Sequence, residues 1–418
     1  MTRGDHRAGS PPIAVPWWQV GGTLLAGLFV AYLDRSNLSV VLPELAKDLG
    51  FAGESFASVS SWALSTFLIG YALANVLGGF LTRHLDPRTV VIWCVAIWSV
   101  ATVAIGFAGS VTVLLLCRFI LGLSEGVYWP QQSRFAQGWF PPSQRTRANS
   151  VIQYYGQYLA LALGFLILTP IHDQFGWRTV FYLTGALGLI LILPLYGRFL
   201  GRAQDAPYSD RATKPSSAPP RLGFAALGGR PILLLLFAHL AQGMLFWGVT
   251  LWIPLAVRSL GFTGWGQAIA SASPYLAAVL LAVPMSMISD RTGRRVQVAA
   301  FGLILPGLLM LALPLAASGA AQLALIIAAL GLYASSYSPN IWAIIQSRVE
   351  PEAVGAVAGL VNGIGAGLGG TIAGFLVGYL LERTGSYVPG FSALGAIVLG
   401  GGAALVAYDR LFRMADES

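Results

Sequence analysis

A series of long apolar runs constrains this chain more than any other feature. Twelve runs follow one another, near residues 17–44, 56–82, 89–108, 111–135, 147–171, 178–200, 231–257, 265–289, 296–317, 321–346, 354–381 and 388–412. Each is close to the roughly 20 residues that an α-helix needs to cross a bilayer. Charged residues make up only 10% of the chain and hydrophobic residues 56%, whereas a soluble domain has about 25% charged residues. We therefore predict an all-α membrane protein with twelve transmembrane helices, and exclude a soluble enzyme, a disordered chain and a disulfide scaffold.

One long polar stretch divides the runs into two sets of six. Residues 201–230 are rich in Pro, Ser, Ala and Arg, a composition typical of a linker. We expect a six-helix bundle in residues 1–200, a linker in residues 201–230 and a second six-helix bundle in residues 231–418. No small-residue cleavage site follows the first run, so it is expected to be a retained helix and not a signal peptide.

The distribution of Lys and Arg predicts how the chain lies in its membrane. Nineteen of the 25 basic residues fall in the termini, the linker and the loops after even-numbered helices, and four fall in loops on the opposite side. This asymmetry predicts cytoplasmic termini in a multi-pass protein of the plasma membrane, here a bacterial inner membrane. Because the net charge of +8 is explained by these loops, nucleic acid is not an expected partner.

The two halves also have similar sequences in the turns that follow their second helices. Both turns carry a short basic motif, with Arg83, Asp86 and Arg88 in the first and Asp290, Arg291 and Arg294 in the second. Matched motifs in two six-helix halves indicate a duplicated bundle. A pseudo-twofold of this kind suits a transporter that rocks around a site near the midplane, with these residues acting in gating.

Four charged residues lie well inside predicted spans, where each costs about 2.5 kcal/mol or more unless it faces a cavity or a partner. Asp34 and Arg35 belong to the first helix, and Arg118 and Glu125 to the fourth. Neighbouring residues point in different directions around a helix, so we expect pairing across the two helices. The sequence leaves open which acid meets which base, and whether the set is a purely structural network. His239 on the seventh helix is a further ionisable group and a possible site residue.

The spans also contain polar residues that could line a central cavity. An arginine fork suits a carboxylate, and a nearby buried acid could carry a proton. Candidate substrate contacts around such an anchor are Tyr32, Tyr71, Gln157, Ser338, Asn340 and Asn362, with Asn37 as a possible addition. Any one of these side chains could equally be a packing or interfacial residue.

Two motifs resemble signatures of a known family. The run Tyr32-Leu-Asp34-Arg35-Ser-Asn37-Leu-Ser39 resembles the first-helix signature of the anion:cation symporters of the major facilitator superfamily, and the run from Arg118 through Glu125 to Pro130 resembles their fourth-helix signature. The resemblance covers essentially the whole chain. It implies the major facilitator fold and an organic-anion:proton symporter that works by alternating access.

The resemblance also implies roles for individual residues. Arg35 would hold the substrate carboxylate, Asp34 and Glu125 would take protons, and Arg118 would pair with an acid. The residues that match the family's substrate contacts are Tyr32, Tyr71, Gln157 and Asn362.

The first loop motif departs from the superfamily's pattern. Arg83 stands where the family has an acid, and Asp86 where it has its second Gly, whereas the second copy keeps Asp290. The acid helps to latch the outward-facing state, so we expect the two halves to differ in gating. The polar set of the tenth helix matches the family only loosely.

The favoured function is import of a small organic carboxylate with protons. The alternatives are a proton-coupled antiporter that exports drugs or metabolites and, in a different class, a membrane receptor without flux. The sequence contains no nucleophile–base pair, phosphate loop or metal-ligand spacing, so we expect neither an enzyme nor a cofactor or metal. We expect a monomer in the lipid bilayer. Sodium remains open as the coupling ion, and an aromatic acid, a sugar acid and a small aliphatic acid remain open as substrates.

Overall fold

The computed structural model describes residues 17–82, 84–141, 151–208, 232–348 and 360–416, together with Gln144 and Ala148. Within these residues all regular structure is helical. The same residues contain twelve helical segments that are long and apolar enough to cross a membrane. The predicted fold class, an all-α protein with twelve spans, is therefore confirmed.

The first six spans form the N-terminal bundle. They are η1 (Trp18–Gly22) with α1 (Thr23–Asp48), α2 (Phe56–Leu81), α3 (Pro87–Gly106), α4 (Val111–Trp139), η2 (Val151–Tyr155) with α6 (Gly156–Phe175), and α7 (Trp177–Ala186) with η3 (Leu187–Ile192) and α8 (Leu193–Phe199). A short 3₁₀ turn, η4 (Ala203–Asp205), follows.

The last six spans form the C-terminal bundle. They are α10 (Ile232–Ser259), α11 (Gly264–Thr292), α12 (Arg295–Leu311) with η5 (Leu313–Leu315), α13 (Gly319–Ser336) with α14 (Ser338–Arg348), η6 (Gly363–Gly369) with α16 (Gly370–Thr384), and α17 (Val388–Asp416). The expected linker lies mostly in residues 209–231, outside the described part of the chain, so the domain boundaries remain predictions.

The fifth and tenth spans differ from their predicted course for local reasons. The fifth span was expected to end at residue 171 but continues to Phe175, where Gly176 adopts a φ of 77° and ends the helix. The tenth span breaks at Tyr337 into α13 and α14. Pro339 lies in the first turn of α14, where its missing N–H costs no helical hydrogen bond.

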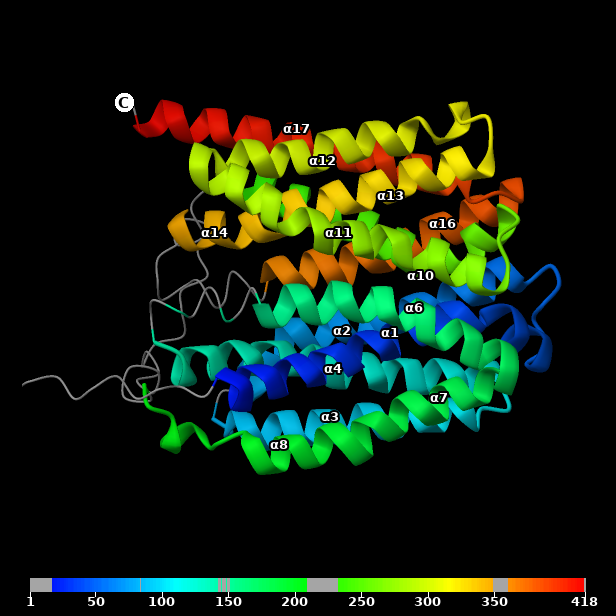
Figure 1. Ribbon diagram of the computed structural model, residues 1–418, viewed down its shortest axis with the longest axis horizontal. Helices are drawn as coiled ribbons and strands as arrows, with labels where there is room; N and C mark the ends of the chain where they lie inside the picture. Colours follow the sequence, from blue (N-terminus) through cyan, green and yellow to red (C-terminus); the bar gives the residue numbers. More distant parts are fainter. Residues whose placement is uncertain are drawn as a thin grey trace, which may run out of the picture.

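The two bundles lie side by side with their helices running in the same general direction (Figure 1). The contact between them is made by α6 against α11, α2 against α16, and α1 against α10. These interface helices carry Asp34, Arg35 and most of the predicted polar residues, whereas Arg118 and Glu125 lie on α4, which packs against α2. The centre of the molecule is therefore lined by both bundles, as a site near the midplane requires.

Within the N-terminal bundle, α4 approaches α2 at backbone distance. A Cβ atom added at Gly122 would lie 2.0 Å from the carbonyl oxygen of Phe67. Such close approach of small residues is the usual way that membrane helices pack tightly. Because Gly122 stands between Arg118 and Glu125, this contact holds both charged residues in the interior.

Candidate functional site

An ion pair at the centre of the N-terminal bundle joins α1 to α4. Arg35 Nε donates to Glu125 Oε2 over 2.6 Å, and the two side chains are only 2% and 1% exposed. The sequence predicted pairing between these helices and left the partners open. In the structure the partners are Arg35 and Glu125. The Nη1 atom of Arg35 forms no hydrogen bond to any described residue, so part of the fork remains available to another acceptor.

Aromatic rings surround the Arg35 guanidinium. Its central carbon lies 4.2 Å from the ring centroid of Tyr32, 4.9 Å from that of Tyr71, 5.4 Å from that of Phe67 and 5.6 Å from that of Trp247. Each of these distances is within the range of a cation–π contact. The rings exclude water from the guanidinium, which strengthens its attraction for an anion.

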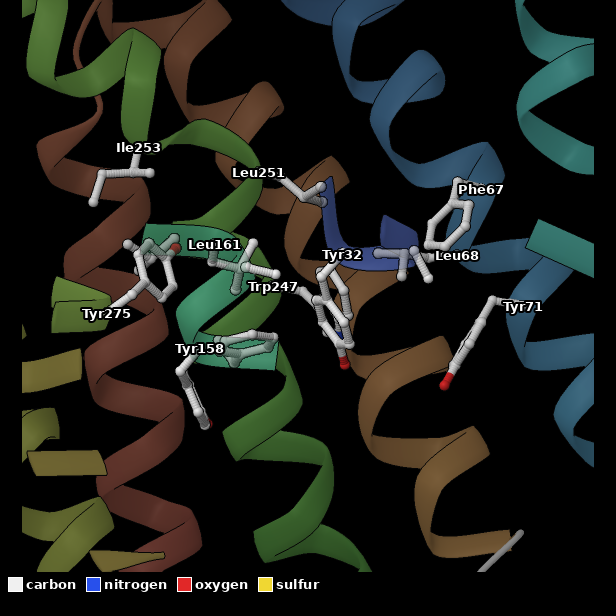
Figure 2. Packing of buried hydrophobic residues seen from close by; sticks show 14 of the residues in the cluster. Tyr32, Phe67, Leu68, Tyr71, Tyr158, Leu161, Trp247, Leu251, Ile253 and Tyr275 are labelled. Atoms are coloured by element: carbon white, nitrogen blue, oxygen red, sulfur yellow. The ribbon is translucent and has the colours of Figure 1, made fainter. Parts of the chain in front are cut away.

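Trp247 comes from the opposite bundle. It stacks with Tyr32 at 6.4 Å between ring centroids and an interplanar angle of 9°. Figure 2 shows these two side chains together at the centre, with Phe67 and Tyr71 on one side and Tyr158 and Tyr275 on the other. Arg35 belongs to α1, but its enclosure by aromatic rings depends on Trp247 of α10. Any separation of the two bundles must therefore alter the surroundings of Arg35.

Asp34 and Arg118 do not pair in this conformation. Arg118 is fully buried, and its Nε donates to the carbonyl oxygen of Ala63 over 3.2 Å. Asp34 is also fully buried and faces Thr184 of α7. Among the described residues neither side chain forms an ion pair, so the expectation that Arg118 pairs with an acid is wrong for this structure. The reason is spacing on α4, because the residue that reaches α1 is Glu125, and Arg118 stands about 10 Å further along the helix axis.

The possible site residue Asn37 lies beside Asp34. Its Nδ2 atom donates to the hydroxyl of Thr184 over 3.3 Å, and the side chain is buried. Asn37 therefore ties α1 to α7 on the side of the helix that carries Asp34.

Asn362 is brought to the Arg35 cluster from the eleventh span. Its Nδ2 atom donates to Asn75 Oδ1 over 2.9 Å and to Tyr71 Oη over 3.3 Å. Tyr71 in turn faces Arg35, so the predicted residues Tyr32, Tyr71, Asn362 and Arg35 form one group. Asn75 was not predicted, although it lies one helical turn after Tyr71 and could have been found by that spacing.

The predicted residues of the tenth and fifth spans do not form one group with one another. Ser338 Oγ lies 3.2 Å from Tyr158 Oη, which joins the two bundles. Asn340 is held elsewhere, since it accepts from Ser289 and donates to the carbonyl oxygen of Ser336. Gln157 is half-buried on α6 and has no hydrogen bond to any described residue. These contacts do not link Asn340 or Gln157 to Arg35.

His239 belongs to a hydrogen-bonded group in the C-terminal bundle. Its Nδ1 atom lies 3.0 Å from Tyr337 Oη, and its Nε2 atom lies 3.3 Å from Gln242 Nε2. The histidine is buried and forms no ion pair with the described residues. The sequence identified the histidine, but not Gln242, which lies three residues later on the same helix face.

The first gating motif has a structural role at the start of α3. Asp86 caps that helix by accepting from the backbone N–H of Arg88 over 3.2 Å, and it also accepts from the N–H of Ala203 over 3.3 Å. Arg88 donates to the carbonyl oxygens of Gly197 and Leu200, each over 2.6 Å. These contacts fasten α3 to the end of α8. Arg83 lies outside the described residues.

The second gating motif is more open. Asp290, Arg291 and Arg294 are exposed around the end of α11. In the described part of the chain none of the three side chains forms an ion pair. The two motifs therefore differ in structure as well as in sequence.

Comparison with known proteins identifies the family. The family model described as Major Facilitator Superfamily matches residues 24–374. This chain belongs to the Major Facilitator Superfamily. The match covers both bundles up to α16, and it agrees with the resemblance carried by the first and fourth helices.

Curated relatives of this superfamily member carry the names of anion transporters. A "Probable sulfoacetate transporter" of Cupriavidus necator is 30% identical over 285 residues, covering 66% of this chain and 65% of that protein. A "Probable galactarate/D-glucarate transporter" of Escherichia coli is 31% identical, covering 38% of this chain and 36% of that protein. The "Hexuronate transporter" of Bacillus subtilis is 28% identical, covering 55% and 54%. The chain thus matches between about a third and two thirds of these relatives' length. Their names agree with the prediction that it is a transporter and not an enzyme.

Two solved structures share the fold. A bacterial homologue of the human lysosomal transporter Spinster, in an inward-facing and occupied conformation, has a TM-score of 0.68 at 19% identity and covers 98% of both chains. The nucleoside transporter NupG has a TM-score of 0.70 at 13% identity, covering 93% of this chain and 99% of that one. At these identities the likeness concerns the fold alone.

Proposed function

We propose that this protein imports a small organic carboxylate together with protons, by alternating access of the site around Arg35. The observation that carries the proposal is the buried Arg35–Glu125 pair, enclosed by aromatic rings from both bundles. A forked cation with a free Nη1 atom is suited to a carboxylate. The anion-transporter names of the relatives support the same substrate class.

Glu125 supplies the coupling in this proposal. In this structure the Glu125 carboxylate pairs with Arg35. A substrate carboxylate that arrives at Arg35 competes for the same guanidinium, and Glu125 then takes a proton because a second buried negative charge would be unpaired. Anion and proton thus favour each other's binding, which is the requirement for symport. Asp34 lies on the neighbouring position of α1 and is a second candidate carrier of a proton.

The two bundles complete the cycle. Trp247 of α10 lies over Arg35 and against Tyr32, so closure of the bundles seals the bound anion and their separation releases it. The proposed setting is the inner membrane of a bacterium, with both termini in the cytoplasm and the protein acting as a monomer. The basic loops described above support this orientation.

Flux into proteoliposomes tests the proposal. Gluconate, benzoate and sulfoacetate represent the three open substrate classes. With an acidic exterior, at least one should accumulate, and the lumen should acidify as it enters. An imposed sodium gradient at equal pH should not drive uptake. Accumulation driven by a sodium gradient alone would mean that sodium, and not the proton, is the coupling ion. Export coupled to proton entry would indicate an antiporter. Absence of flux would favour a receptor.

A further inference from the structure

A groove on the outer surface of the N-terminal bundle lies between the end of α2 and the helices α3 and α4. Its volume is about 410 Å³, which is within the usual range for small-molecule sites. In Figure 1, α3 lies on the side of this bundle that faces away from the C-terminal bundle. Trp93, Ile97 and Ile120 line the groove and are exposed. The groove is therefore separate from the site around Arg35 and opens toward the membrane.

The groove has roughly the depth of one membrane leaflet. It begins at Thr82 and Thr89, near the end of the bundle, and reaches Ile97 further along α3. Thr89 and Ile97 are eight positions apart, which corresponds to about 12 Å along a helix axis. One half of the hydrocarbon core of a bilayer is about 15 Å thick. A molecule that follows the groove thus runs from the membrane surface almost to the midplane, as a lipid acyl chain does.

The walls of the groove suit a hydrocarbon chain, because most of the lining side chains are apolar. The hydroxyl of Ser124 donates to the carbonyl oxygens of Ile120 and Leu121. The hydroxyl of Thr82 donates to the carbonyl oxygen of Gly78. Both hydroxyls are bonded within their own helices, so they offer little to a polar ligand. Apolar walls from neighbouring helices instead give packing contacts along the length of a chain.

The end of the groove at Thr82 lies against a basic side chain. Arg134 of α4 donates through Nη1 to the carbonyl oxygen of Thr82 over 3.3 Å, and it is half-buried. Arg134 stands two positions after Gln132, the last residue of the apolar span. A guanidinium group at this level is suited to the phosphate of a lipid. Basic pockets between transmembrane helices bind anionic headgroups in this way.

One acid lies near this end of the groove. Asp86 is close enough to Arg134 to interact with it electrostatically. Its carboxylate accepts from the backbone N–H groups of Arg88 and Ala203 over 3.2 Å and 3.3 Å. In the described part of this turn and of the adjoining end of α4, Arg88 and Arg134 outnumber the acid. The end of the groove therefore has a net positive charge.

We propose that this groove binds one anionic phospholipid, with an acyl chain along α3 and the phosphate at Arg134. The chain also packs against Ser124 and Val127, which line the groove on α4. These positions lie on either side of Glu125 in the sequence, so the lipid supports the helix that holds Glu125 against Arg35. The proposal does not depend on which anion the protein transports.

Lipid binding to the purified, delipidated chain in detergent tests the proposal. Phosphatidylglycerol should raise the thermal unfolding midpoint more than phosphatidylcholine with the same acyl chains. From an equimolar mixture, native mass spectrometry should show one retained phosphatidylglycerol per chain, about tenfold in excess over phosphatidylcholine, which corresponds to about 1.4 kcal/mol. Equal retention of the two lipids would overturn the proposal.

Two further outcomes of these measurements would also overturn it. Glycerol 3-phosphate has the phosphate without an acyl chain and should leave the unfolding midpoint unchanged. A shift by glycerol 3-phosphate as large as that by phosphatidylglycerol would indicate a site for free phosphate. A dimer of chains without bound lipid would indicate that a second copy covers the groove.

One pair of variants locates the acyl chain. Ile97→Trp fills the groove and should abolish retention of phosphatidylglycerol. Val100→Trp is the matched control, because Val100 is exposed on the same helix and does not line the groove. It should retain the lipid as the unchanged chain does. The unfolding midpoint without lipid checks that both variants fold. Equal retention by the two variants would place the lipid elsewhere and overturn the proposal.

A second set of variants locates the headgroup. Arg134→Gln should remove the preference for phosphatidylglycerol over phosphatidylcholine. Arg134→Lys should keep most of it, because a phosphate also accepts from a point charge. Arg198→Gln is the matched charge control, since Arg198 is exposed on α8 at the same end of the bundle. This control should keep the full preference. An unchanged preference in Arg134→Gln would show that Arg134 does not bind the headgroup and would overturn the proposal.

Discussion

The two bundles differ in the kind of polar side chain that they bury. The N-terminal bundle buries two acidic residues, Asp34 and Glu125, and two basic residues, Arg35 and Arg118. The C-terminal bundle buries a hydrogen-bonded chain of uncharged side chains, Tyr333, Gln242, His239 and Tyr337, which we call the neutral chain. A buried charge needs a partner that can be exchanged for a ligand, whereas a neutral chain satisfies itself. Under the proposed function, the anion and the proton bind in the N-terminal bundle, where the buried charges lie.

The largest expected effect is at the coupling acid. Glu125→Gln mimics the protonated carboxyl group and cannot release the proton. It should abolish accumulation driven by a pH gradient, while exchange of internal for external substrate continues. The measurement is uptake into proteoliposomes, with counterflow as the control for binding and movement. If the variant still accumulates substrate when only a pH gradient is imposed, Glu125 does not carry the coupled proton, and Asp34 is the alternative.

The second effect concerns the anchor. Arg35→Lys keeps the charge but loses the fork and the flat stacking surface between Tyr32 and Tyr71. Affinity should fall about 100-fold, which corresponds to about 2.7 kcal/mol. Calorimetric titration with the tightest-binding anion measures it. Near-normal affinity would show that Arg35 does not bind the substrate. The charged interior of the N-terminal bundle would then not be the anion-binding site.

A third test addresses how the neutral chain is held in place. A Cβ atom added at Gly365 would lie 2.2 Å from His239 Cδ2, so Gly365→Ala must displace the ring. Overpacking of this kind costs about 1–3 kcal/mol, and the thermal unfolding midpoint should fall. Gly400→Ala is the matched control, because its nearest neighbour would be 3.6 Å away. Equal unfolding midpoints for the two variants would show that the His239 ring can move away from residue 365 without loss of stability.

The smallest expected effect compares the two gating motifs. Asp86 caps α3, and Asn is an equally good cap, so Asp86→Asn should leave the conformational balance almost unchanged. Asp290→Asn should shift the balance between inward and outward states by a few-fold. Labelling of single cysteines introduced on either face reports the shift. Equal shifts from both variants would contradict the asymmetry.

Much of the site was predictable because its signals are local. A charge inside an apolar run is visible in the sequence, and its cost in a membrane singles it out. Asp34, Arg35, Arg118 and Glu125 were found in this way. Tyr32 lies on the same helix as Arg35, and Tyr71 stands out as a polar residue in the middle of the second span. By contrast, Gln242 was not predicted, because its contact with Tyr333 of α13 arises only when the two helices pack together.

The sequence alone determined the twelve spans and the charged residues that lie inside them, since both follow from the length and solvation of single segments. The tertiary structure alone decided that Arg35 pairs with Glu125 and leaves Arg118 to the backbone of α2. It also decided that Trp247 closes over Arg35 from the other bundle. These choices depend on the register at which separate helices pack, and that register is set by close backbone contacts such as the one at Gly122. No single segment of the sequence contains that information.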